Sequence, residues 1–128
     1  MGNSVQVLVV EDEPVIGDVL AAALEDAGYS ARWAASGEEA LKILEQQGAE
    51  CRALITDVRL ARGKSKLTGW DVARQARERN PSIPVVYTSG DSGVDWSAQG
   101  VPKSIMIVKP YAMAQVIAAV SQLLNEGG

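Results

Sequence analysis

Apolar residues along the chain alternate between short continuous runs and longer stretches with helical spacing. The first run, residues 5–10, is rich in valine, which is typical of a strand buried on both faces of a parallel sheet. Between Pro14 and Gly28 the apolar residues recur at helical spacing, as in an amphipathic helix. Proline in the first turn and glycine after the last are typical helix boundaries. The chain is therefore predicted to begin with a strand followed by a helix.

The same alternation continues toward the C-terminus. Ser36 and Glu39 have the spacing of a capping box at the start of a second helix. Residues 89–100 are rich in Gly, Ser and Asp, so we expect any helix there to be short or frayed. Further strands are predicted at residues 30–34, 52–56, 83–88 and 105–108, and further helices at about 70–79 and 112–125.

This order of five strand–helix units predicts a parallel sheet with helices on both faces and right-handed crossovers. No repeat, linker or low-complexity segment interrupts the order, and the length of 128 residues is typical of one domain. We therefore expect residues 1–128 to form a single α/β domain.

The composition narrows the chemistry that the chain can perform. The sequence contains no histidine and one cysteine. The missing histidine excludes Ser-His-Asp and Cys-His catalysis and a histidine-ligated zinc site. A lone cysteine cannot form an internal disulfide, which suits a reducing compartment. Any reaction must therefore rely on carboxylates, hydroxyls, lysine or a metal with oxygen ligands.

The formal net charge of −4 argues against a nucleic-acid partner, so we expect no direct DNA binding. No apolar stretch approaches the roughly 20 residues of a membrane span. The first four residues lack the charged and apolar regions of a signal peptide. A cytoplasmic protein without a membrane segment is the expected class.

Polar residues follow four of the five predicted strands. In a parallel α/β sheet the carboxyl ends of the strands meet at one edge, where ligands bind. We therefore expect three acids, a hydroxyl and a lysine to converge there. The residues at these strand ends are Glu11-Asp12, Asp57, Thr88-Ser89-Gly90 and Lys109-Pro110.

Clustered carboxylates raise one another's pKa unless a cation lies among them. Acids are also favoured at a helix start, but this explains Glu13 and not Asp57, which closes an apolar strand. Oxygen ligands in an open geometry suit Mg²⁺, and a lysine suits a phosphoryl oxygen. The set predicts a phosphoryl-transfer site with a carboxylate as the nucleophile.

Five short motifs along the chain, in their sequence and order, resemble the receiver domain of bacterial two-component response regulators. The resemblance covers essentially the whole chain. It implies a flavodoxin-like, doubly wound (βα)5 sandwich with a parallel sheet of order 2-1-3-4-5. The motifs are Val9-Val10-Glu11-Asp12-Glu13-Pro14, Ile55-Thr56-Asp57, Thr68-Gly69, Pro84-Val85-Val86-Tyr87-Thr88-Ser89-Gly90 and Val108-Lys109-Pro110-Tyr111.

The resemblance implies that Asp57 accepts a phosphoryl group from a phosphohistidine on a sensor histidine kinase or a histidine phosphotransfer protein. Asp12 and Asp57 would bind Mg²⁺ or Mn²⁺, with Glu11 binding it directly or through water and Arg59 offering its backbone carbonyl. Such a receiver assists its own metal-dependent phosphorylation and dephosphorylation without being a classical enzyme.

The resemblance also assigns the residues that would contact the phosphoryl group. Ser89, five residues after Pro84, would be the switch hydroxyl, and Gly90 would offer an unobstructed backbone N–H. Lys109 would pair with the phosphate, and the Lys109–Pro110 peptide bond is expected to be cis.

The chain departs from the family pattern in two places. Met106 stands three residues before Lys109, where the family usually carries the aromatic ring of its conformational switch. The chain thus partly resembles a receiver subgroup that lacks this aromatic. The loop at residues 59–69 is unusually long and basic, and it is either a solvated loop or a docking element.

The last predicted helix carries no charge, and its outer positions are predicted to be Gln115, Ala119 and Gln122. It is either simply neutral or, together with the last strand, a docking or homodimer face. An alternative to the phosphoacceptor is a phosphorylation-independent docking module with the same fold. An aspartyl phosphatase would need a second acid where Arg59 stands, and a flavin protein would need a hydroxyl-rich phosphate loop after the first strand.

Overall fold

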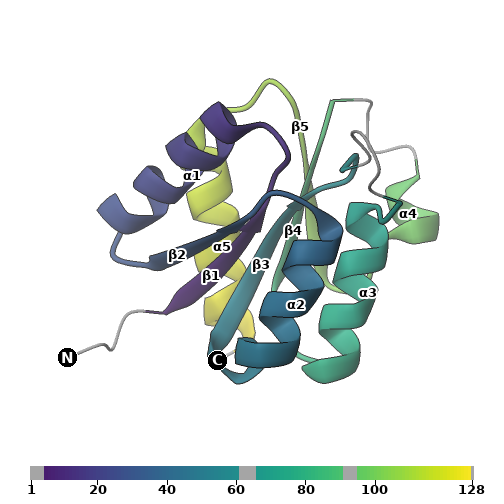
Figure 1. Ribbon diagram of the computed structural model, residues 1–128. Helices are drawn as coiled ribbons and strands as arrows, with labels where there is room; N and C mark the ends of the chain where they lie inside the picture. Colours follow the sequence, from purple (N-terminus) through teal and green to yellow (C-terminus); the bar gives the residue numbers. More distant parts are fainter. Residues whose placement is uncertain (1–4, 61–65, 91–94, 128) are drawn as a thin grey trace.

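The computed structural model describes residues 5–60, 66–90 and 95–127 (Figure 1). The basic loop predicted at residues 59–69 falls partly on residues 61–65, so the hypothesis of a docking element there lies outside the described residues. Among the described residues, no helix combines the length and apolar character needed to cross a membrane.

The strands form one parallel sheet in the order β2-β1-β3-β4-β5, which confirms the predicted fold. This order places β1 and β3 in the interior of the sheet and leaves β2 and β5 at its edges. The strands are β1 (Gln6–Val10), β2 (Ser30–Ala34), β3 (Cys51–Asp57), β4 (Val85–Ser89) and β5 (Ser104–Val108).

Helices cover both faces of the sheet, as Figure 1 shows, with α1 and α5 on one face and α2 and α3 on the other. The fourth helix is a single short turn, as the composition of residues 89–100 predicts. The helices are α1 (Pro14–Asp26), α2 (Gly37–Gln47), α3 (Gly69–Arg79), α4 (Trp96–Gln99) and α5 (Met113–Gly127), and a 3-10 turn, η1 (Gly48–Glu50), follows α2.

Two hydrophobic cores lie on opposite faces of the sheet because successive strand residues point in opposite directions. In β1, Leu8 and Val10 pack into the core beneath α2 and α3. Val7 and Val9 pack into the core beneath α1 and α5. All four side chains are fully buried, which explains why the first strand reads as a continuous apolar run.

Two local expectations need correction, and a third is confirmed in part. The fourth strand begins at Val85 rather than at Ile83, because Pro84 has no N–H to donate and contributes only its carbonyl, which accepts from Leu54 N–H. Ala119 is buried against the sheet instead of lying on the outer face of α5. At the start of α2, Ser36 Oγ accepts from Glu39 N–H at 3.1 Å, which is one half of the predicted capping box.

The start of α3 fixes the loop that follows the third strand. Thr68 and Asp71 form a complete capping box, in which each side chain accepts from the other residue's backbone N–H. Gly69 N–H donates to Val58 O at 2.8 Å. A Cβ atom on Gly69 would lie 2.1 Å from the carbonyl oxygen of Asp57, so glycine is required for this close approach.

Candidate functional site

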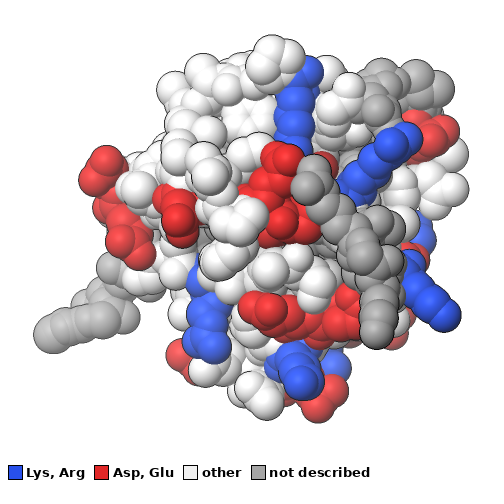
Figure 2. Space-filling view, turned by 45° about the horizontal axis from the view of Figure 1, so that its top comes forward, with Lys and Arg blue, Asp and Glu red and all other residues white. Residues whose placement is uncertain are grey.

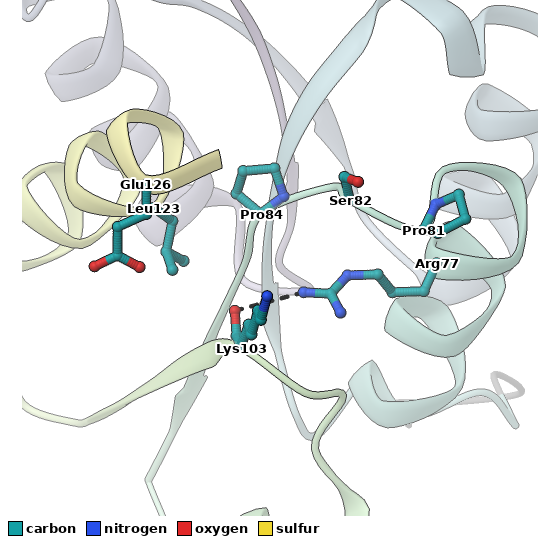
Figure 3. Close-up of a pocket in the computed structure, with 7 residues that line it drawn as sticks. All are labelled: Arg77, Pro81, Ser82, Pro84, Lys103, Leu123 and Glu126. Carbon is teal, nitrogen blue, oxygen red and sulfur yellow. Dashed lines mark hydrogen bonds between the residues drawn. The ribbon is translucent and has the colours of Figure 1, made fainter. Parts of the chain in front are cut away.

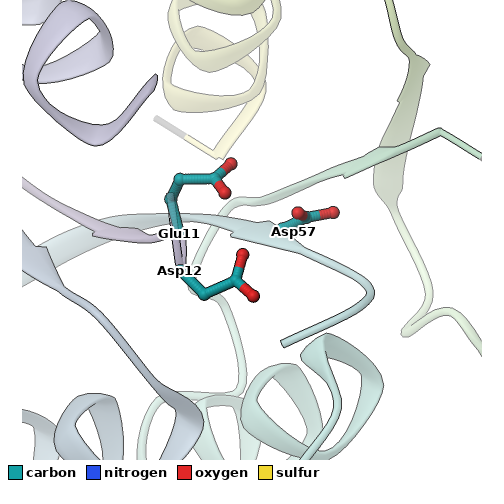
Figure 4. Close-up of side chains that lie close together, drawn as sticks. All are labelled: Glu11, Asp12 and Asp57. Carbon is teal, nitrogen blue, oxygen red and sulfur yellow. The ribbon is translucent and has the colours of Figure 1, made fainter. Parts of the chain in front are cut away.

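Three carboxylates converge where β1 and β3 end, and we refer to Glu11, Asp12 and Asp57 as the acidic cluster (Figure 4). One oxygen from each residue lies within 4.8 Å of the others. Glu11 and Asp57 are buried, with exposed fractions of 1% and 6%, whereas Asp12 is half-buried. The structure therefore brings together the three acids that the strand ends predict.

The backbone hydrogen bonds of the sheet hold these residues in place. Glu11 N–H donates to Ala34 O at 3.0 Å, so the pairing of β1 with β2 continues to the first acid. On the other side of the site, Val58 N–H donates to Thr88 O at 2.9 Å, which fixes the residue after Asp57.

Lys109 reaches the acidic cluster from the end of β5. Its Nζ lies 2.9 Å from Asp57 Oδ2 and 3.6 Å from Glu11 Oε1. Lys109 N–H donates to Ser89 O at 2.8 Å, and the Lys109–Pro110 peptide bond is cis. Three of the four strand ends singled out in the sequence thus contribute to one network of charges.

The acidic cluster is electrostatically costly without a cation. Burial, together with the charge of Asp57, raises the pKa of Glu11 from 4.5 to about 7. Burial also raises the pKa of Asp57, although the hydrogen bond and charge of Lys109 oppose this shift. Burial alone would lower the pKa of Lys109, but its hydrogen bond to Asp57 and the charges of Asp57 and Glu11 raise it.

The donor set fits a divalent cation that prefers oxygen ligands. All three ligating groups are carboxylates, and Glu11 Oε1 is buried without a hydrogen-bond partner among the described residues. A cation at this point would compensate that oxygen and the mutual repulsion of the acids. The residues of the acidic cluster could therefore hold a metal ion such as Mg²⁺.

The remaining predicted site residues border this cluster. Arg59 directs its backbone N–H to the Asp57 carboxylate, and its side chain is exposed. Ser89 is buried at the end of β4, and the following Gly90 is exposed with open space where a Cβ atom would lie. These positions leave a hydroxyl and a backbone amide beside the end of β3.

Met106 occupies its predicted place in β5, opposite Tyr87 of β4. Met106 is half-buried and packs against the core beneath α2 and α3. The ring of Tyr87 is fully buried, lies 4.6 Å from the ring of Trp70, and its hydroxyl accepts from Val101 N–H at 3.0 Å. The aromatic side chain of this region therefore belongs to the fourth strand and is fixed in the core.

The sequence analysis assigned no role to two further residues near the acidic cluster. Trp33 Nε1 donates to the carbonyl oxygen of Glu11 at 2.9 Å. The hydroxyl of Tyr111 is buried without a hydrogen-bond partner among the described residues. Burial raises the pKa of Tyr111, with the charge of Lys109 opposing the shift. No local sequence signal identifies Trp33, because its partner is 22 residues away.

Charge is distributed unevenly around this end of the sheet. Figure 2, which brings the carboxyl ends of the strands forward, shows acidic side chains gathered at the centre of the face, with lysine and arginine side chains beside them. This distribution suits a site that combines anionic ligands for a cation with a basic contact for an anion.

A separate hollow lies at the opposite end of the strands, between α3 and α5 (Figure 3). Arg77 on its wall donates from Nε to Ile83 O and from Nη1 to Pro102 O, each at 2.7 Å. Its Nη2 also reaches Lys103 O at 3.5 Å, the contact drawn in Figure 3. The guanidinium group of Arg77 is therefore already bound to backbone carbonyls and is not open to an anion in this hollow.

Comparisons with known proteins agree with this geometry. Residues 7–121 match the family described as the response regulator receiver domain. The crystal structure of a response regulator receiver protein from Sinorhizobium medicae is 39% identical, with a TM-score of 0.91 and 98% of each chain covered.

Curated relatives show the same domain inside larger proteins. The sensor kinase CckA of Brucella abortus is 31% identical over 98% of this chain but only 13% of its own length. The probable transcriptional regulatory protein TcrX of Mycobacterium tuberculosis is 28% identical over 99% of this chain and 53% of its own length. The chain thus spans about half or less of these relatives. With its matched profile, its 2-1-3-4-5 sheet and its acidic cluster, the chain belongs to the response regulator receiver domain family of two-component signalling, whose partners are histidine kinases.

Proposed function

We propose that this chain is the phosphoacceptor of a two-component phosphorelay, with Asp57 taking the phosphoryl group from a phosphohistidine on a sensor histidine kinase or histidine phosphotransfer protein. An Asp57 oxygen forms a bond to phosphorus while the bond between phosphorus and the imidazole nitrogen breaks. The donor histidine keeps the electron pair of that bond. The observation that carries the proposal is the 2.9 Å contact of Lys109 Nζ with Asp57 Oδ2 inside a cluster of three carboxylates.

A divalent cation, Mg²⁺ or Mn²⁺, is the cofactor that this donor set favours. Glu11, Asp12 and Asp57 would hold it, together with the backbone carbonyl of Arg59. When bound, such a cation neutralises charge on the phosphoryl oxygens during transfer. The chain's own residues orient the nucleophile, since Lys109 and the Arg59 N–H both hold the Asp57 carboxylate.

The product would be read through altered protein contacts. Ser89 Oγ and Gly90 N–H, at the end of the strand that pairs with β3, would bind phosphoryl oxygens, with Ser89 as the switch hydroxyl. Val108, at the end of β5, is 49% exposed. We propose that β5 and α5 together form the surface for docking or homodimer formation. We expect the relay to operate in the cytoplasm.

The decisive experiment is phosphorylation by a small donor. Wild-type protein incubated with Mg²⁺ and acetyl phosphate should gain one phosphoryl group, seen by intact mass, that is stable in acid and labile in base. Asp57→Asn should gain none, and neither should wild type in EDTA.

Asp18→Asn is the matched control, because Asp18 is an exposed carboxylate on α1 outside the acidic cluster. It should be labelled as fully as wild type. A wild-type protein that takes no phosphoryl group would instead favour the phosphorylation-independent docking module, for which Met106 is the supporting observation. Equal labelling of Asp57→Asn would move the acceptor to another residue.

A further inference from the structure

A hydrogen bond from β2 reaches the backbone of the acidic cluster. Trp33 lies beside Val9 of β1, and its Nε1 donates to the carbonyl oxygen of Glu11 at 2.9 Å. That carbonyl belongs to the peptide unit between Glu11 and Asp12. The direction of this peptide determines where both carboxylates leave the backbone, so one indole N–H acts on two acids.

The indole is confined on its other side by the first helix. A Cβ atom on Gly17 would lie 2.5 Å from Trp33 Nε1 and 2.8 Å from Cε2, so the ring packs directly against the backbone of α1. Gly17 N–H donates to Glu13 O at 3.0 Å, which places this contact in the first helical turn. The ring therefore lies between α1 and the Glu11–Asp12 peptide and cannot move away without displacing one of them.

The other contacts of Glu11 leave this role to Trp33. The carboxylate accepts from Glu13 N–H at 3.1 Å and lies 3.6 Å from Lys109 Nζ. These contacts orient the side chain of Glu11, whereas the tryptophan orients the peptide that leads to Asp12. Asp12 is half-buried and lies at the start of a loop, where backbone direction is less constrained than in a strand.

We infer that Trp33 is a positioning residue for a divalent cation, acting through the Glu11–Asp12 peptide to preorganise two of the three carboxylates. The inference rests on the proposed function, because it requires that the acidic cluster binds such a cation. Residues that hold metal ligands without touching the metal typically change its affinity by about 10- to 100-fold. Because the hydrogen bond of Trp33 acts through the backbone, we expect its effect on the Mg²⁺ affinity to lie at the lower end of this range.

The test is a calorimetric titration of Mg²⁺ into wild type, Trp33→Phe and Trp96→Phe. Phenylalanine keeps an aromatic ring and removes the indole N–H. Trp96 is the matched control, because its Nε1 also donates at 2.9 Å, to Ser104 Oγ at the first residue of β5, which is the end of the strand opposite to Lys109. We expect the dissociation constant to rise about tenfold in Trp33→Phe and by less than about twofold in Trp96→Phe.

Thermal unfolding without Mg²⁺ separates positioning from simple stability. A purely structural role predicts lower melting temperatures in both variants and an unchanged dissociation constant for Mg²⁺. That result would overturn the inference. Gly17→Ala supplies a second test, since its Cβ would push the indole away from the Glu11 carbonyl and should weaken Mg²⁺ binding in the same way.

If wild type fails to bind Mg²⁺, the proposed function is overturned as well. If wild type binds Mg²⁺ and both tryptophan variants bind it equally tightly, this inference alone is overturned.

Discussion

The buried carboxyl group of Glu11 links three equilibria, which are folding, protonation and the binding of a metal ion. Its side chain is 1% exposed, and burial together with the charge of Asp57 raises its pKa to about 7. At neutral pH a substantial fraction of this carboxyl group is therefore protonated in the absence of a cation. A metal must displace that proton to use the oxygen as a ligand, so metal affinity should rise with pH through this range.

The same pKa predicts how stability depends on pH. Without a divalent cation, the contribution of Glu11 is fully present below its unfolded pKa of 4.5 and is lost as the pH rises through about 7, because the folded state binds more protons in between. A shift of this size corresponds to roughly 3 kcal/mol. Urea unfolding in EDTA should therefore show a larger loss of stability from pH 5 to pH 8 in wild type than in Glu11→Gln.

Glu11→Gln cannot titrate at this position, and the raised pKa of Asp57 contributes to the slope that remains. Hydrogen bonds from Thr68 lower the pKa of Asp71. The contribution of Asp71 to the free energy of unfolding is therefore lost as the pH falls, equally in wild type and in Glu11→Gln. Parallel pH profiles for wild type and Glu11→Gln would contradict the assignment.

At the scale of elements, the side chain of Arg77 adds polar contacts to the apolar packing that holds α3 against the sheet. Arg77 donates to the carbonyl oxygens of Ile83 and Pro102, which precede β4 and β5. The helix thus connects the loops that precede β4 and β5. An arginine that sequence reasoning would leave in solvent is instead a structural contact.

Removing these donors should destabilise the fold without affecting the acidic cluster. Arg77→Met keeps the apolar stem but removes the donors to the carbonyl oxygens of Ile83, Pro102 and Lys103. We expect a loss of about 2 kcal/mol in the free energy of unfolding. Arg79→Met, the same change at an exposed position of the same helix, should cost less than about 0.5 kcal/mol. Chemical denaturation measures both, and equal effects would rule out the proposed tie.

Most elements were predictable because their signals are local. Buried strands read as apolar runs, and Pro14 and Gly28 delimit α1 as expected. The Thr68–Asp71 capping box was missed although its spacing is readable in the sequence. Arg77 could not have been assigned, because a residue's exposure on a helix does not reveal which distant carbonyls it reaches.

At the scale of the whole molecule, the acidic cluster exists only in the assembled sheet. Its acids come from β1 and β3 and its lysine from β5, and the order 2-1-3-4-5 places these strands in one layer. The topology rule for parallel sheets predicted this convergence from the strand ends alone. It could not predict Trp33, whose contact depends on the space left by Gly17 in a different element.

A cation that binds only the assembled site should stabilise the entire fold. Mg²⁺ at about 100 times its dissociation constant should raise the free energy of unfolding by about 2.7 kcal/mol. Thermal unfolding should show this gain for wild type and a much smaller one for Asp12→Asn. NaCl of equal ionic strength is the control, and an equal gain with NaCl would indicate general screening instead of a site.

The contact between Lys109 and Asp57 has a mechanical consequence. It joins residues 52 positions apart and passes over β4 to connect the edge strand β5 with the interior strand β3. An edge strand pairs with one neighbour only, so the contact gives β5 a second connection to the interior of the sheet. Near neutral pH, a phosphoryl group on Asp57 would place a charge of about −2 beside Lys109 in this contact. The connection between β5 and β3 would then depend on the chemical state of one carboxylate.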